Sequence, residues 1–238
     1  MSNVSRHVYN PFPLAVFFII VILVFLFVIV FFGLVGAAFE TLGFSTLDVV
    51  LLLIATLAGS LINIPLFTLT SDEPLVTDTY VTVFGMTYRV PAVTEGSRKT
   101  VIAVNVGGAL IPVAVSLYLL WRFPDTIGFA ILGVTLVAIV SHFIARPVKG
   151  VGIVSPGLIA PIIAAIFALI VSAQISSVNV FTLAYVSGVL GTLIGADLTN
   201  LNAIKGLGAP VASIGGAGTF DGVFLSGIMA ILIAVLFL

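Results

Sequence analysis

Residues 8–39 read VYNPFPLAVFFIIVILVFLFVIVFFGLVGAAF, a run that contains no charged side chain. A helix needs about 20 apolar residues to cross the hydrocarbon core of a bilayer, so this run is long enough to cross with tilt. A cleavable signal peptide has an apolar region of only about 7–15 residues followed by a small-residue cleavage site. We therefore expect a permanent membrane-spanning helix.

The composition extends this prediction to the whole chain. Of 238 residues, 61% are hydrophobic and 7% are charged, whereas about a quarter of the residues in soluble domains are charged. The net charge of −1 leaves no basic surface for nucleic acid. The absence of cysteine excludes disulfides and thiolate chemistry. We expect a multi-pass protein of the cell membrane whose immediate surroundings are the lipid bilayer.

Six further apolar windows follow the first, and polar or Gly/Pro-containing stretches separate them. They cover residues 47–69, 100–121, 127–145, 155–173, 178–200 and 220–238. The prediction is an all-α integral membrane protein with seven transmembrane helices, forming a single polytopic domain over residues 1–238.

The positive charges predict the orientation, because Lys and Arg accumulate in cytoplasmic loops. With a cytoplasmic N-terminus and an outside C-terminus, only Arg122 lies outside. The other seven basic residues are then cytoplasmic: Arg6, Arg89, Arg98, Lys99, Arg146, Lys149 and Lys205.

The cytoplasmic connection between the second and third windows, residues 70–99, is too long for a plain turn. From Tyr80 to Val90 it alternates and is rich in β-branched and aromatic residues. This pattern predicts a small β-hairpin that turns near Gly85.

Six polar residues are predicted to lie at one depth, near the cytoplasmic leaflet. An ionisable group inside a bilayer costs about 2.5–3.5 kcal/mol at a helix centre, so such groups usually face a cavity or a partner. The six come from the ends of five helices: Asn63, Asn105, His142, Arg146, Asp197 and Asp221.

Each of these residues also has a purely structural explanation. Asp221 would stabilise a helix N-terminus, and Asp197 would mark a helix boundary that continues to Asn200. His142 would be an interfacial side chain, and Arg146 would extend its charge to the membrane surface. Asn63 and Asn105 would join helices by hydrogen bonds.

Glycine spacing predicts which side of the sixth window Asp197 occupies. Gly188, Gly191 and Gly195 allow a neighbouring backbone to approach closely. At about 100° per residue, Asp197 lies on the side opposite to Gly188 and Gly195. A regular helix therefore places the carboxylate on an apolar side, with Leu190.

Residues 201–219 are rich in glycine and include Pro210 among apolar residues, which makes them a candidate re-entrant segment. Gly216 and Gly218 lead into the last helix, and such a turn is able to cradle an anion. Packing is the alternative explanation, because glycines in membrane proteins usually allow close helix contact.

Four motifs together resemble a known family. They are NVGGALIP at residues 105–112, RPVKGVGI at 146–153, GADLTNL at 195–201 and IGGAGTFDG at 214–222. They resemble an uncharacterised family of prokaryotic membrane proteins catalogued only as a domain of unknown function, and the resemblance covers Leu47 to the C-terminus. This resemblance implies one common site but no particular reaction.

Asp197 and Asp221 also bear a loose resemblance to the two carboxylates of intramembrane aspartyl proteases. In those enzymes one carboxylate activates water and the other supplies a proton. Their motifs are Tyr-Asp, Gly-x-Gly-Asp and Pro-Ala-Leu. This chain instead has Ala196-Asp197, Phe220-Asp221 and Ala209-Pro210-Val211.

Three hypotheses for function remain open. The first is an aspartyl-type intramembrane hydrolase that uses Asp197 and Asp221 on a helical membrane-protein substrate. The second is a proton- or cation-coupled carrier with Asp197, Asp221, Asn63 and Asn105 along its pathway. The third is a non-catalytic subunit that binds partner subunits of a membrane complex. A divalent ion held by His142, Asp197 and Asp221 is a variant of the first two hypotheses. No cofactor or metal is predicted, because one intramembrane histidine and no cysteine argue against structural zinc.

Overall fold

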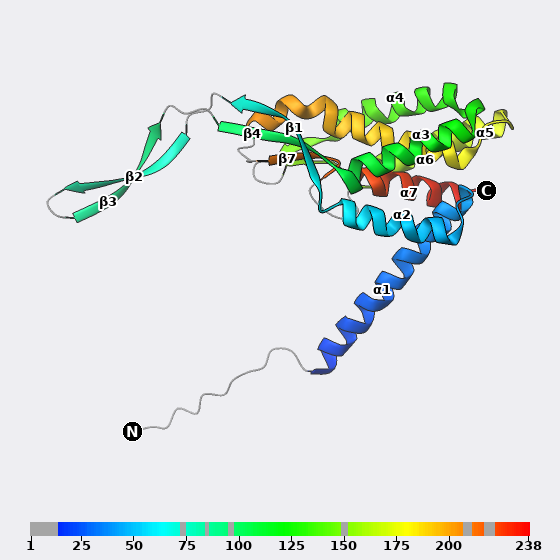
Figure 1. The fold of residues 1–238 in the computed structure, drawn as a ribbon, viewed down its shortest axis with the longest axis horizontal. Coiled ribbons are helices and arrows are strands. Elements are labelled where there is room, and N and C mark those ends of the chain that lie inside the picture. The colour runs from blue at the N-terminus through cyan, green and yellow to red at the C-terminus, as the bar shows by residue number, and fades with distance from the viewer. Residues whose placement is uncertain are drawn as a thin grey trace.

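The computed structural model describes residues 14–71, 75–83, 86–94, 98–148, 152–206, 211–216 and 222–238. The fold is mostly helical, with small sheets at one end (Figure 1). The α-helices are α1 (Leu14–Thr41), α2 (Thr46–Gly59), α3 (Ile111–Arg122), α4 (Ile127–Ile144), α5 (Ile159–Gln174), α6 (Val180–Thr192) and α7 (Gly222–Val235). Two π-helices, η1 (Val106–Leu110) and η3 (Leu193–Asp197), and two 3₁₀ segments, η2 (Pro124–Thr126) and η4 (Leu198–Gly206), adjoin them.

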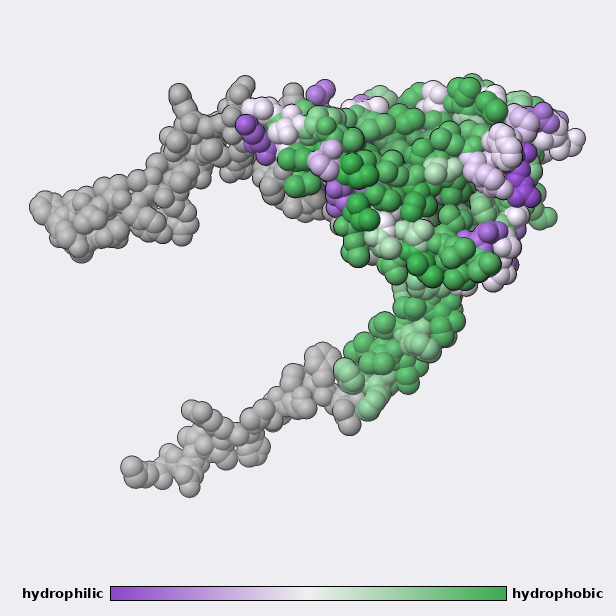
Figure 2. Space-filling model, in the orientation of Figure 1, coloured by the Kyte–Doolittle hydropathy of each residue, from purple (hydrophilic) through white to green (hydrophobic). Residues whose placement is uncertain are grey.

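Within the described ranges, three helical stretches are long and apolar enough to cross a membrane: Val16–Thr41, Pro124–Ile144 and Val180–Ile204. Four shorter apolar helices accompany them. Apolar side chains cover most of the visible face of the bundle and α1 (Figure 2). Seven spans, and the orientation of the termini, remain predictions because the shorter helices are below the length that a complete crossing needs.

Helix α6 is the centre of the bundle and packs against α3, α4, α5 and α7. Its glycines allow these contacts. A Cβ on Gly188 would come within 2.9 Å of the Ser226 carbonyl oxygen of α7, and one on Gly191 would come within 2.5 Å of Val137 of α4. As a result, ten residues of α6 are buried.

Helix α1 leaves the bundle and is exposed over most of its length (Figure 1). Only its C-terminal part is buried, where the Phe39 ring lies 6.0 Å from that of Tyr185 and 6.4 Å from that of Phe224. A helix that is apolar on all sides and lacks protein contacts is suited to a lipid environment.

A three-stranded sheet covers one end of the bundle. Its strand order is β1 (Asn63–Ser71), β4 (Arg98–Asn105) and β7 (Val211–Ile214). β1 pairs with β4 antiparallel, with an irregularity between Pro65 and Phe67, and β4 pairs with β7 parallel. Two smaller antiparallel pairs are β2 (Leu75–Val83) with β3 (Met86–Thr94), and β5 (Arg146–Val148) with β6 (Gly152–Val154).

Two of the predicted membrane spans contain a strand, so these spans and the all-α class are corrected to a mostly helical fold with small sheets. The window 47–69 is helical only to Gly59 and continues as β1, while the window 100–121 begins as β4. Both strands consist mainly of apolar, β-branched or aromatic residues, and hydropathy alone does not distinguish a buried strand from a helix. The hairpin predicted around residues 80–90 is present as β2 and β3. Its turn at Gly85 lies outside the described residues.

Candidate functional site

The elements that carry the described residues among the predicted polar set meet at the sheet-covered end of the bundle (Figure 1). Helices α2, α4 and α6 end there, and α3, α5 and α7 begin there. Asn63 begins β1, Asn105 ends β4, and His142 lies in the last turn of α4. Arg146 lies in β5 and Asp197 at the end of η3, with Asn200 beyond it in η4.

Asn105 is fully buried and joins three elements. Its Nδ2 donates to the Ser60 carbonyl at 2.8 Å and to Asn63 Oδ1 at 3.1 Å. Its Oδ1 accepts from the Gly108 amide at 2.7 Å, which caps η1. Asn63 Oδ1 also accepts from the Ser213 hydroxyl of β7 at 2.6 Å. This network ties the sheet to the end of α2 and to the helical segment that leads into α3.

Glycines allow the backbones at this junction to touch. A Cβ on Gly107 would overlap the Thr56 carbonyl oxygen of α2, and one on Gly108 would overlap the Gly215 carbonyl oxygen after β7. Gly215 and Gly216 have φ values of +78° and +79°, a conformation that disfavours other residues. We refer to Gly107, Gly108, Gly215 and Gly216 as the glycine junction.

Asp197 binds directly to the glycine junction. Its Oδ2 accepts a hydrogen bond from the Gly215 amide at 2.7 Å, and the residue is half-buried. The expected placement on an apolar side of a regular helix is corrected, because η3 is a π-helix and does not keep the 100° rotation per residue. The glycine-rich turn was predicted to cradle an anion through Gly216 and Gly218; the neighbouring Gly215 amide binds the chain's own carboxylate.

Two of the predicted site residues, Asp221 and Gly218, lie outside the described residues. The pairing of Asp197 with Asp221 therefore remains a hypothesis. Gly216 is described, and it lies beside the Gly215 amide that binds Asp197.

His142 and Asn200 stabilise the end of η3. His142 Nδ1 lies 2.8 Å from Thr199 Oγ1, and this hydroxyl donates to the Gly195 carbonyl at 2.7 Å. Asn200 Nδ2 donates to the Gly195 and Ala196 carbonyls at 2.9 and 3.0 Å. Arg146 is exposed and pairs with Val154 through β5 and β6.

Sequence analysis missed a set of buried hydroxyl groups in the bundle. The groups without a hydrogen-bond partner among the described residues are those of Thr56, Ser141, Thr182, Tyr185 and Ser187. A sixth hydroxyl, on Thr192, donates to Ser226 of α7 at 2.9 Å. The signal available in the sequence was the concentration of hydroxyl residues in the window 178–200, but hydropathy averaging conceals it.

The fold and the polar end define a class: a mostly helical protein with helices of membrane-spanning length and a glycine-lined junction between a small sheet and the bundle. The chain belongs to the DUF1614 family, described as a protein of unknown function, whose match covers residues 57–233. This match confirms the resemblance predicted from the glycine and aspartate motifs. Searches of curated proteins and of solved structures found no match.

Proposed function

We propose that this protein is a multi-pass carrier of the cell membrane that moves protons along α6, with Asp197 as the titrating group at one end. The observation that carries this proposal is the presence of three hydroxyl groups without partners on the central helix, those of Thr182, Tyr185 and Ser187. All three residues are fully buried.

The energetic cost of these hydroxyls supports internal water. A buried polar group without a partner costs about 1–3 kcal/mol, and native proteins usually satisfy such groups with protein or ordered water. Three such groups on one helix make a set of bound water molecules the simplest explanation. Water molecules and hydroxyls that alternate along a helix are able to pass a proton by exchanging hydrogen bonds.

The hydroxyls extend along the length of α6 on two sides of the helix: Tyr185 and Thr192 face α7, and Ser187 faces α4. Thr182 lies in its first turn, and the Thr192–Ser226 pair lies at its end, next to η3. At 1.5 Å per residue, Thr182 and Asp197 are separated by about 20 Å. Beyond Thr182, the Asn179 amide donates to Thr126 Oγ1 at 3.3 Å. Polar groups therefore continue toward the end of the bundle opposite Asp197.

The first test is proton flux into proteoliposomes that contain a pH-sensitive dye, with a potassium diffusion potential as the driving force. Asp197→Asn is expected to reduce the flux at least about tenfold, because proton relays depend on such intramembrane carboxylates. Tyr185→Phe is expected to reduce it several-fold, because Tyr185 faces α7, as does the Thr192–Ser226 pair, and the change removes its hydroxyl from the path.

Ser172→Ala is the matched control, because Ser172 is half-buried on α5 and donates to its own helix at the Leu169 carbonyl. Its flux should equal that of the unmodified protein. The proposal is overturned if the unmodified protein conducts no faster than empty liposomes, or if Asp197→Asn conducts at the full rate.

A second candidate function is the aspartyl-type intramembrane hydrolase. The Asp197–Gly215 hydrogen bond favours it, because it places this carboxylate beside the segment that continues to Asp221. In such a reaction, one carboxylate takes a proton from water while the other, protonated, donates one to the carbonyl oxygen of the substrate.

A fluorogenic transmembrane-helix peptide in micelles tests this second function. A hydrolase should cleave the peptide, and both Asp197→Asn and Asp221→Asn should abolish cleavage while Ser172→Ala retains it. Cleavage that survives either aspartate substitution contradicts the dyad. Since only the carrier proposal requires flux, the two assays distinguish the two functions.

A further inference from the structure

A groove of about 550 Å³ runs between α2 and α3. Leu51 and Ala55 of α2 form one wall, and Ile111, Ala114 and Val115 of α3 form the other. The groove is open to the apolar surface of the bundle, where lipid would surround the protein. Its walls are therefore suited to a hydrocarbon chain.

One mouth of the groove carries a carboxylate. Asp48 lines the groove there and belongs to the capping box of α2, in which its Oδ2 accepts from the Ser45 amide at 3.1 Å and from the Ser45 hydroxyl at 2.6 Å. These bonds hold the exposed side chain at the start of α2. Two other acidic residues belong to this end of the bundle. Glu40 lines a separate groove of α2 and accepts from Thr46, and Asp125 lies in η2, three residues after Arg122.

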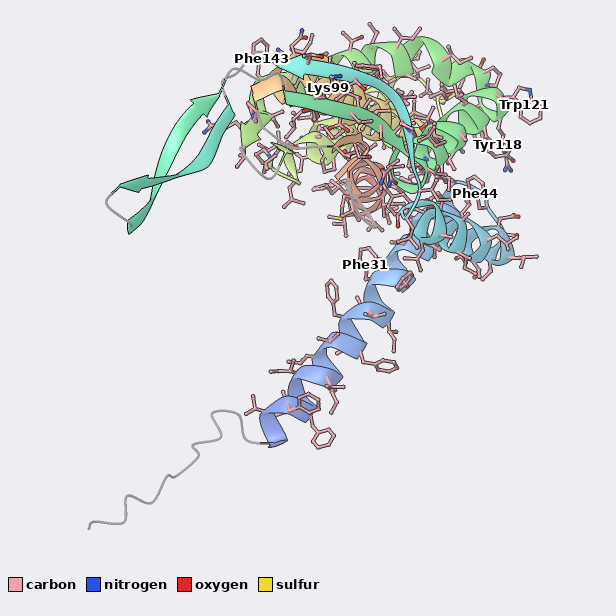
Figure 3. All side chains as sticks on the ribbon, turned by 60° about the vertical axis from the view of Figure 1, so that its left-hand side comes forward. Phe31, Phe44, Lys99, Tyr118, Trp121 and Phe143 are labelled. Atoms are coloured by element: carbon pink, nitrogen blue, oxygen red, sulfur yellow. The ribbon has the colours of Figure 1, made fainter. Side chains whose placement is uncertain are left out.

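A guanidinium group lies near the same mouth. The rings of Phe44 and Tyr118 lie 5.6 Å apart at this mouth (Figure 3). Arg122 lies one helical turn beyond Tyr118, and its Nη1 donates to the carbonyl of Gly43, the neighbour of Phe44, at 3.3 Å. Asp48 therefore lines the entrance of the groove, and Arg122 is bound to the residue that precedes Phe44, another lining residue.

We propose that this groove binds one phospholipid with a zwitterionic, primary-amine headgroup. The acyl chain lies between α2 and α3, the phosphate pairs with Arg122, and the ammonium group pairs with Asp48. The two charges are complementary to such a headgroup, and charge-assisted hydrogen bonds favour a primary amine at a carboxylate. The site lies at the opposite end of the bundle from Asp197 and is independent of the proposed proton path.

Trp121, the only tryptophan of the chain, reports on this mouth because its ring lies 6.1 Å from that of Tyr118. The experiment measures quenching of its fluorescence by brominated phosphatidylethanolamine and by brominated phosphatidylglycerol in mixed bilayers with unlabelled lipid. The expected binding preference for phosphatidylethanolamine is about threefold, the size of one exposed ion pair.

Three variants and one control test the assignment. Arg122→Gln should weaken the binding of both lipids alike, because both carry the phosphate that it pairs with. Asp48→Asn should reduce the preference to about unity, because it removes the carboxylate that pairs with the ammonium group. Ala114→Phe should do the same by filling the groove. Arg146→Gln, which changes an exposed arginine at the other end of the bundle, should keep the preference. Equal quenching by both lipids, or a preference that survives Asp48→Asn and Ala114→Phe, overturns the proposal.

Discussion

Asn105→Ala is expected to lower the free energy of unfolding by about 3–5 kcal/mol, because it leaves buried backbone groups without partners. The Gly108 amide loses its acceptor, and the Ser60 carbonyl loses the Asn105 donor. Asn63 loses one donor but retains the Ser213 hydroxyl. The measurement is the thermal or denaturant midpoint of the purified protein in detergent.

Asn200→Ala is the control for this prediction. Asn200 is half-buried and donates only within its own helical segment, to Gly195 and Ala196. The Gly195 carbonyl also retains its bond from Thr199. The expected loss is about 1 kcal/mol or less. Equal losses for Asn105→Ala and Asn200→Ala would contradict the proposed role of Asn105.

Gly215→Ala is expected to prevent the glycine junction, at the sheet-covered end of the bundle, from forming. A left-handed conformation costs an L-residue about 1–2 kcal/mol, and the added Cβ would lie 2.7 Å from the Ala109 amide nitrogen and 2.6 Å from its Cβ. We expect a loss above about 4 kcal/mol, because neither backbone segment is able to move without breaking the junction. The measurement is the yield of monodisperse protein together with its thermal midpoint.

Two glycine controls separate the cost of the left-handed conformation from the cost of backbone overlap. Gly43 has a φ value of +84°, but an added Cβ would approach only the flexible Arg122 side chain, at 3.1 Å. Gly43→Ala should therefore cost only about 1–2 kcal/mol. Gly128 lies in α4 with nothing within 4 Å of an added Cβ, so Gly128→Ala should be neutral or stabilising. If the Gly215→Ala protein has the same thermal midpoint as the Gly43→Ala protein, backbone overlap is excluded as the cause of the destabilisation at Gly215.

Hydropathy predicted where apolar segments lie but not always what they form. The window 127–145 corresponds closely to α4, because both flanks carry helix-ending signals. The windows 47–69 and 100–121 each combine a helix with a strand, since Ile64, Ile102 and their neighbours are as apolar as a span. Their pairing joins residues far apart in sequence, and no local pattern encodes that contact.

The location of the candidate site was more accessible to prediction than its contacts. Helices that alternate in direction bring the ends of α2, α4 and α6 to one level, so Asn63, His142 and Asp197 could be placed at the same end. The partner of Asp197 could not be predicted, because η3 departs from α-helical rotation and Gly215 directly follows a strand, β7, in a segment predicted to be re-entrant. The hydroxyls of α6 were missed because Ser and Thr are common in membrane helices whatever their role.

The parallel pairing of β4 with β7 has a consequence for biogenesis. Val101 pairs with Val211, so a strand made in the first half of translation must wait for one made near the end. Until then, the Asn63 side chain lacks the Ser213 hydroxyl and one edge of β4 lacks its partner. Such distant pairing is slow and leaves intermediates prone to aggregation. We expect ribosome-stalled chains that end before residue 211 to be strongly retained by the insertion machinery or degraded, and the polar end to close only when α7 emerges.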